Sequence, residues 1–503
     1  MKNKKKRKGF TLIELLAVII VLAIIALIAT PIIFNVIENA KLKSLENSCY
    51  GVIDGVRTKY AEGLLNSIDG TVKLKGNVTE ITVSGEQPIE GTWEIDNSRD
   101  SNNRGVKIKD VKFGSMKDYT CTNINSDGTI NSKVTCTKGG NNDEPTSEYT
   151  DNSGANKPEL FDNMVVIKYE NEKWLVANTS EKWYDYDAKE WANAVVLNSG
   201  VTKNVGDEVT EEDVALWYVW IPRYKYTIFN GNNGSATAQL INVTFESGTN
   251  RTGTVTCSDN ADGSETCSTI TNGTSTYTHP AFKFGNTELT GFWAGKFEVS
   301  GSTSVITIKP NVTSLINTTV SGFFTVIQNV KTIYGINNAD SHMMKNMEWG
   351  AVAYLKQSKY GLGTTDIEVN TDLDHYYTGG GTGNAYKTNI SQSTTGNIYG
   401  VYVSGGAFEY VMGNYNDIIS SAGFSSMPAA KYYDKYTSRT GKIGDATTET
   451  SRWYGDGEHF PNSQYPWFVR GGSYTYGPAE GVFEAYDGDG IEYNSARAVL
   501  SAQ

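Results

Sequence analysis

The stretch Gly9-Phe10-Thr11-Leu12-Ile13-Glu14, followed by an apolar run from Leu15 to Ala29, determines how the rest of this chain is interpreted. Six Lys and Arg residues and no acidic residue precede it. The apolar block from Phe10 to Phe34 is 25 residues long, and a helix of that length covers about 37 Å, which is enough to cross a bilayer. A basic leader before an apolar block is typical of exported proteins. We therefore predict a leader over residues 1–9 and a transmembrane segment over residues 10–34.

Glu14 lies within this block, where an unpaired carboxylate costs about 3 kcal/mol. An ordinary single-span anchor would explain the apolar run, but it leaves Gly9, Phe10 and Glu14 without a role. The stretch resembles the N-terminus of type IV prepilins. That resemblance implies that a prepilin peptidase cleaves between Gly9 and Phe10 and methylates the new amino group. It also implies that Glu14 pairs with the N-terminal amine of a neighbouring pilin subunit.

Length and charge limit what the remaining chain can be. A chain of 503 residues has room for two or three domains. Its net charge of −12 falls to −18 once the six positive charges of the leader are removed. Because no basic stripe offsets this charge, we expect no nucleic-acid ligand. The 30 tyrosines, the 51 glycines and many short Thr/Val/Ile runs predict an exposed β-rich protein.

Four of the five cysteines flank Asp-Gly turns between Thr/Val-rich runs, a pattern that indicates hairpins. Cys121 then falls nearly opposite Cys136, and Cys257 nearly opposite Cys267, so we predict two cross-strand disulfides. A zinc site is the alternative, but neither CxxC spacing nor a nearby histidine supports it. Residues 259–265 also resemble a calcium loop faintly, although Ala261 occupies a ligand position.

The fifth cysteine, Cys49, shares a helical stripe with apolar residues and is predicted to be a buried thiol. The stripe continues through Leu45, Val52, Val56, Tyr60 and Leu64.

We predict an α+β chain, with a pilin helix over residues 10–65 that is kinked at Pro31. A small antiparallel β head over residues 66–138 follows the helix. Residues 139–157 are polar and read as a linker. The remaining domain spans residues 158–503, with its core at 216–503.

Six blocks within that core carry a second resemblance. They are WYVWIP (217–222), FWAGKFEVS (292–300), NMEWGAVAY (346–354), GGAFEY (405–410), VRGGSY (469–474) and SAR (495–497). In this order they resemble the formylglycine-generating-enzyme, or sulfatase-modifying-factor, domain, in which the segment that NMEWGAVAY resembles is a helix. The resemblance implies a variant of the C-type lectin fold.

An enzymatic role is not expected. Family members that oxidise sulfatases use a cysteine late in the chain, and no cysteine follows Cys267 here. The four histidines have no HExxH or GxSxG context. No cofactor or metal is expected. Glu409 could still be a calcium ligand, but Gly406 replaces the family's Asn, which argues against a calcium site. We instead assign structural roles, with buried carboxylate–guanidinium pairs, to Glu348, Trp349, Glu409, Arg470, Gly471, Gly472 and Arg497.

Two aromatic regions are candidate binding surfaces. The cluster from Trp183 to Trp191 could stack on sugars, but core packing is the favoured interpretation. The segment from Tyr474 to Asn494 combines Tyr, Asp and Asn on a Gly-rich frame, which is the composition of a paratope. It also resembles the variable ends of retroelement-diversified proteins, with an ordinary Tyr/Gly-rich loop as the alternative. The predicted ligand-binding residues are Tyr474, Tyr476, Tyr486, Asp487, Asp489, Tyr493 and Asn494.

These features predict a minor type IV pilin or pilus-tip adhesin that carries a lectin-fold domain for a surface protein or glycan. It would first lie in the cytoplasmic membrane and then in an extracellular pilus or on the cell surface. The alternatives are a structural pseudopilin of a type II secretion or DNA-uptake machine and, less favoured, a surface enzyme.

Overall fold

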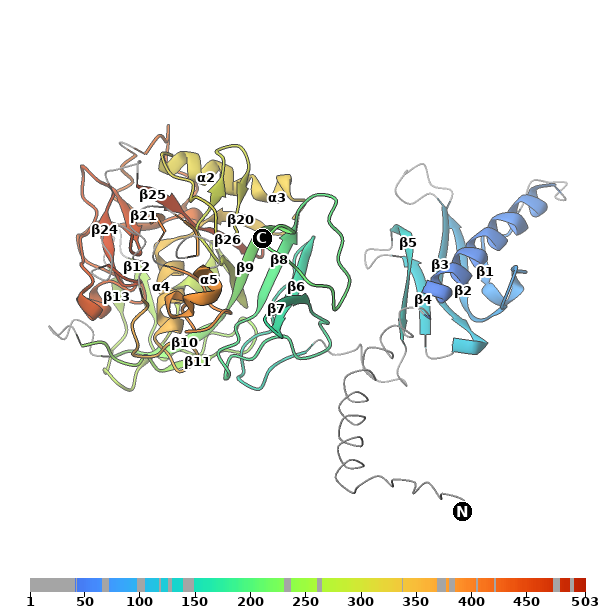
Figure 1. Ribbon diagram of the computed structural model, residues 1–503, viewed down its shortest axis with the longest axis horizontal. Coiled ribbons are helices and arrows are strands. Elements are labelled where there is room, and N and C mark those ends of the chain that lie inside the picture. Colours follow the sequence, from blue (N-terminus) through green and yellow to red (C-terminus); the bar gives the residue numbers. More distant parts are fainter. Residues whose placement is uncertain are drawn as a thin grey trace, which may run out of the picture. The chain divides into compact units, whose positions relative to one another are not determined.

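The computed structural model divides the chain into two compact units, Met1–Pro145 and Thr146–Gln503, which are described separately (Figure 1). Gly9, Phe10, Glu14 and the predicted membrane span lie outside the described residues. Within the described residues, no helix is both long and apolar enough to cross a membrane. The described residues are 41, 43–65, 72–96, 105–116, 119–124, 129–138, 149–229, 237–259, 265–336, 338–368, 377–379, 385–403, 406–419, 422–473, 480–488 and 493–503.

In the first unit, a helix over residues 43–65 packs on a five-stranded antiparallel sheet. Leu45, Cys49, Val52 and Val56 are fully buried, and their three- and four-residue spacing places them on the helix face that covers the sheet. The predicted stripe is therefore confirmed at these positions, whereas Leu64 is exposed. The strands, which neighbour one another in chain order, are β1 (Lys75–Asn77), β2 (Pro88–Asp96), β3 (Gly105–Phe113), β4 (Tyr119–Ile124) and β5 (Ile130–Lys138).

A seven-stranded antiparallel sheet forms the centre of the second unit, in the order β20-β26-β17-β9-β8-β6-β7. Every residue of β9 and β17 is buried. The last strand of the chain lies between β17 and β20, so the C-terminal residues form part of the core. The strands are β6 (Met164–Glu170), β7 (Lys173–Val176), β8 (Asn193–Leu197), β9 (Val214–Pro222), β17 (Gly291–Gly295), β20 (Asp340–Met343) and β26 (Ala498–Ser501).

A second sheet is built around β21 (Phe408–Tyr415). This strand pairs antiparallel with β23 (Trp467–Arg470) and parallel with β22 (Asp434–Tyr436) and β25 (Asn494–Ala496). Strand β24 (Ala485–Asp487) forms the edge beside β23.

Short elements complete the second unit. Helix α4 (Asn346–Lys356), which was expected from the NMEWGAVAY block, is buried along its whole length and packs against β21. The others are α2 (Val320–Gln328), α3 (Val330–Ile333), α5 (Ala385–Thr388), the sheet β11-β10-β14 (Val243–Phe245, Tyr224–Thr227, Thr276–Thr278), and the hairpins β12–β13 (Cys257–Asp259, Glu265–Cys267), β15–β16 (Lys283–Phe284, Thr287–Glu288) and β18–β19 (Ser300–Gly301, Ile306–Thr307).

Both predicted disulfides are confirmed. Cys121 faces Cys136 across β4 and β5, and Cys257 faces Cys267 across β12 and β13. Cys49 is a free buried thiol. Asp259 and Glu265, at the ends of the stretch that resembles a calcium loop, are paired residues of the hairpin β12–β13.

Residues 149–157, which we expected in the linker, belong to the second unit. Asp151 accepts hydrogen bonds from the Tyr186 amide and the Ser153 hydroxyl. Asn156 donates to the carbonyls of Gly248 and Thr290. The polar composition of this stretch therefore reflects side chains that bind backbone groups of the domain.

Candidate functional site

The predicted ligand surface lies on the edge of the second sheet. Tyr486 on β24 is 44% exposed, and Tyr493, just before β25, is 53% exposed. Asp487 is half-buried, and its carboxylate accepts a hydrogen bond from the Asn462 amide at 2.6 Å. Tyr474, Tyr476 and Asp489 lie outside the described residues. Two half-exposed tyrosine rings, one of which lies 5.2 Å from the His459 ring, therefore form the described part of this surface.

Asn494 is a correction to the predicted surface. It is only 4% exposed, as the first residue of β25, and it lies opposite Phe408 of β21. All three residues of β25 are buried, and the strand pairs directly with β21. Asn494 therefore belongs to the frame and not to the exposed surface.

Gly471 and Gly472 keep the backbone close to the core just before the predicted ligand surface begins at Tyr474. Gly471 has a φ of +73°, and a Cβ there would lie 2.6 Å from the Val403 carbonyl oxygen. A Cβ on Gly472 would lie 1.9 Å from the Glu480 carbonyl oxygen. A side chain at either position would clash with a backbone carbonyl, and Gly471 also has a positive φ, which glycine adopts readily. The two glycines therefore allow the backbone at 471–472 to pass close to the backbone of Glu480.

Arg497 and Glu409 form a buried carboxylate–guanidinium pair, the kind of contact that we predicted for the four charged motif residues. Arg497 Nε donates to Glu409 Oε2 at 2.8 Å, and Arg497 Nη2 donates to Glu409 Oε1. The guanidinium also donates to the carbonyls of Gly295 and Tyr402, each at 2.7 Å. Burial raises the pKa of Glu409 to about 7, although Arg497 opposes that shift. The pair joins β21 to the central sheet. Both Glu409 oxygens are engaged, so a calcium ion at Glu409 would have to displace the guanidinium.

Glu298 explains why position 406 is glycine. A Cβ on Gly406 would lie 1.5 Å from a Glu298 carboxylate oxygen. That carboxylate accepts from the Ser314 hydroxyl at 2.7 Å and from the Ala407 amide at 3.3 Å. Burial raises the pKa of Glu298.

The predicted guanidinium partner is wrong for Glu348. Its carboxylate accepts from His342 Nε2 at 3.0 Å and from the Lys345 amide at 2.8 Å. The other ring nitrogen of His342 lies 3.1 Å from Asp340. Burial alone would lower the pKa of His342, but the two carboxylates raise it. Asp340, His342 and Glu348 therefore link β20 to the first turn of α4.

Arg470 also lacks a directly hydrogen-bonded carboxylate. It is fully buried, and Nη2 donates to the Ala446 carbonyl at 2.7 Å. Its Nε and Nη1 atoms are buried without a hydrogen-bond partner among the described residues. Burial lowers its pKa, whereas Asp445 opposes the shift.

Sequence reasoning missed a group of three carboxylates beside the ligand surface, of which Asp456 and Glu484 are buried and Glu480 is half-buried. Burial raises the pKa of Asp456 and Glu480 to about 7 and that of Glu484 to about 8. A Cβ on Gly481 would lie 2.9 Å from Asp456, and one on Gly457 would lie 2.9 Å from Glu484. The sequence signal that could have indicated this group is an acidic residue followed directly by glycine, which occurs at Asp456-Gly457 and at Glu480-Gly481.

The aromatic cluster and His279 are structural features. The rings of Trp183, Tyr184, Tyr186 and Trp191 are at most 5% exposed, so they belong to the core and not to a stacking surface. His279 is also buried, and burial lowers its pKa to about 3.

Comparison with known proteins identifies the N-terminus. Residues 4–30 match the prokaryotic N-terminal methylation motif. The chain is 30% identical over 83 residues to prepilin peptidase-dependent protein A of Clostridium perfringens (strain 13 / Type A), which is 16% of this chain and 59% of that protein. The match therefore spans about three fifths of the relative's length.

A solved structure, the Major Tropism Determinant I1 variant, aligns with 80% of this chain and 82% of its own chain. The identity is 14% and the TM-score 0.25, too low to support an argument about fold or function.

Proposed function

We propose that the chain is a minor type IV pilin or pilus-tip adhesin whose second unit binds a protein or glycan outside the cell. The N-terminal methylation motif supports a pilin-type precursor that prepilin peptidase processes and that assembles with other pilins. That motif precedes a second unit more than twice as long as the first. Because so large a unit on every subunit would crowd a filament, the proposal places the protein at the tip or at sparse positions.

In this proposal, the function of the second unit is to bind that protein or glycan. Its buried Glu409 and Arg497 side chains engage each other and backbone carbonyls. The exposed rings of Tyr486 and Tyr493 supply contact area at low entropic cost. A structural pseudopilin would share the processing but would not need this surface.

The test is to purify exported protein from cells that express the prepilin peptidase and to analyse its N-terminus by mass spectrometry. The expected first residue is Phe10, carrying one methyl group. Cells without the peptidase provide the control and should retain residues 1–9. A retained leader in both strains, or a protein that never copurifies with filaments, would refute the proposal.

A further inference from the structure

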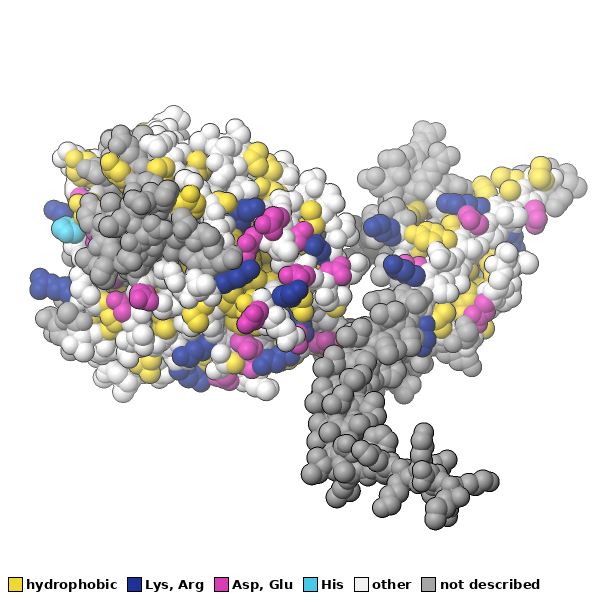
Figure 2. Space-filling model, in the orientation of Figure 1, with side chains coloured by type: hydrophobic (Ala, Val, Ile, Leu, Met, Phe, Trp, Pro, Cys, Tyr) yellow, Lys and Arg dark blue, Asp and Glu magenta, His cyan; other side chains and the backbone are white. Residues whose placement is uncertain are grey.

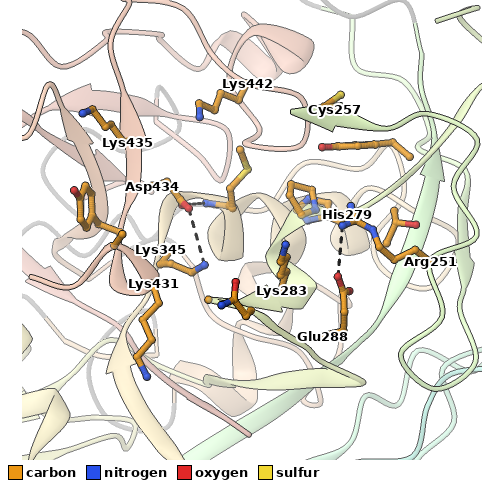
Figure 3. A pocket seen from close by; sticks show the side chains of 18 residues that line it. Arg251, Cys257, His279, Lys283, Glu288, Lys345, Lys431, Asp434, Lys435 and Lys442 are labelled. Carbon is orange, nitrogen blue, oxygen red and sulfur yellow. Dashed lines mark hydrogen bonds and ion pairs between the residues drawn. The ribbon is translucent and has the colours of Figure 1, made fainter. Parts of the chain in front are cut away.

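The second unit contains a cavity of about 650 Å³ that is separate from the tyrosine surface. The start of α4, the hairpin β15–β16, strand β14 and residues 430–442 line it (Figure 3). Ligand-binding cavities typically measure 300 to about 1,000 Å³. The cavity is therefore large enough for an oligosaccharide fragment and much larger than a single phosphate.

The described lining is strongly basic, although the whole chain is acidic. Its two acidic residues are Glu288 and Asp434. Elsewhere on the second unit, the face in Figure 2 shows acidic and basic side chains interspersed. His279 adds no charge, since burial lowers its pKa to about 3. The basic lining residues are Arg251, Lys283, Lys345, Lys431, Lys435 and Lys442.

Several of these cations are already neutralised. Arg251 lies 3.5 Å from Glu288, and Lys431 lies 3.2 Å from Asp340. Lys435 pairs with Asp417. These three side chains therefore contribute little net field to the cavity.

Lys283 and Lys345 differ from that group. Within the described residues, Lys283 makes no ion pair and is exposed. The Lys345 side chain is only 7% exposed, and its Nζ lies 4.0 Å from both Glu348 and Asp434. Both distances are too long for hydrogen bonds, so this nearly buried ammonium has donors available to a ligand. The backbone N–H of Met347 already donates to Asp434 at 2.8 Å.

The rest of the lining fits a sugar better than a bare anion. Tyr433, Pro280 and Met347 supply apolar surface for the C–H faces of a ring. Asn286 adds a neutral polar group that can bind a hydroxyl.

We propose that this cavity binds an acidic oligosaccharide, with its carboxylate or sulfate at Lys283 and Lys345. Charge-assisted hydrogen bonds from the two ammonium groups would fix the acid group, and the apolar wall would hold the sugar ring. This site goes beyond the proposed pilin function, since it requires neither filament assembly nor the tyrosine surface.

The test measures binding by calorimetry to the purified full-length chain in detergent. The probes are galacturonate hexamer, heparin hexasaccharide and, as the neutral control, maltohexaose. The two acidic probes distinguish carboxylate from sulfate recognition. Binding of either one should weaken as NaCl rises from about 0.05 to about 0.5 M, because salt screens the interaction.

Lys283→Glu is the test variant, and Lys331→Glu on α3 is the matched control. Both make the same charge change, but Lys331 does not line the cavity. Lys283→Glu should raise the Kd about tenfold, as expected for loss of a hydrogen bond to a charged group, whereas Lys331→Glu should leave it unchanged. Lys345→Met, with circular dichroism to check its fold, should act like Lys283→Glu.

Three outcomes would overturn the proposal. The first is maltohexaose binding as tightly as the acidic probes. The second is an equal effect of Lys283→Glu and Lys331→Glu. The third is that neither acidic probe binds.

Discussion

Replacing Arg497 with Met should destabilise the second unit by about 3–5 kcal/mol at pH 7, the range observed when one partner of a buried ion pair is removed. Arg497 donates to both Glu409 oxygens and to the carbonyls of Gly295 and Tyr402. Met fills most of the apolar volume but donates nothing. Each carbonyl left without a donor costs about 1–3 kcal/mol, and the isolated carboxylate adds to that cost.

The loss should also depend on pH. Burial already raises the pKa of Glu409 to about 7 with the guanidinium beside it, and Arg497 opposes that rise. Removing Arg497 therefore moves the pKa of Glu409 in the folded state higher still. A carboxyl group whose pKa is higher in the folded state than in the unfolded state stabilises the fold fully at pH values below its unfolded pKa of about 4.5. This stabilisation is lost as the pH rises through the folded-state pKa. The variant should thus lose more stability between pH 5 and pH 8 than the wild type, by about 1.4 kcal/mol for each additional pKa unit.

The assay is urea unfolding of the full chain in detergent, followed by tryptophan fluorescence at pH 5 and pH 8. All ten tryptophans except Trp93 lie in the second unit, so the signal reports that unit. Glu409→Gln combined with Arg497→Met should remove the additional pH dependence, because no carboxyl remains at position 409. Arg439→Met, at an exposed site, is the control and should change stability by less than about 0.5 kcal/mol. A cost below about 1 kcal/mol, or an equal cost at both pH values, would show that the pair does not anchor β21.

Two further outcomes concern assembly and binding. Glu14→Ala should insert into the membrane but enter filaments poorly, because the carboxylate is proposed to pair with the amine of a neighbouring subunit. Thr11→Ala is the control in quantitative immunoblots of sheared filaments, and equal incorporation of both variants would contradict this role. Tyr486→Ala with Tyr493→Ala should abolish attachment to a partner captured by the wild type without changing the urea midpoint. Retained attachment would place the binding site elsewhere.

The sequence predicted features that depend on local patterns. The Asp-Gly turns between Thr/Val runs correctly placed both disulfides, because a hairpin brings its flanking residues opposite each other. The apolar stripe through Cys49 correctly identified the buried helix face, and the NMEWGAVAY block predicted α4.

Features that depend on distant contacts could not be predicted in the same way. Asn494 lies in a Tyr- and Asp-rich stretch whose composition suggests exposure, but β25 pairs with Phe408 and its neighbours far earlier in the chain. Glu348 is near His342 in sequence, yet only the packing of β20 beside α4 shows that this histidine, and not an arginine, is its partner. No local pattern distinguishes the two possibilities.

The ion pair is buried, whereas the side chains of Tyr486 and Tyr493 are exposed. Arg497 binds Glu409 and backbone carbonyls, and none of its hydrogen bonds involves the side chain of Tyr486 or Tyr493. Tyr486 alternates with the buried Ala485 on an edge strand, so its ring can change without altering the strand pairing. A frame fixed by buried charges can therefore support different exposed side chains at nearly constant stability. This separation of frame from contact surface is what a displayed binding domain requires.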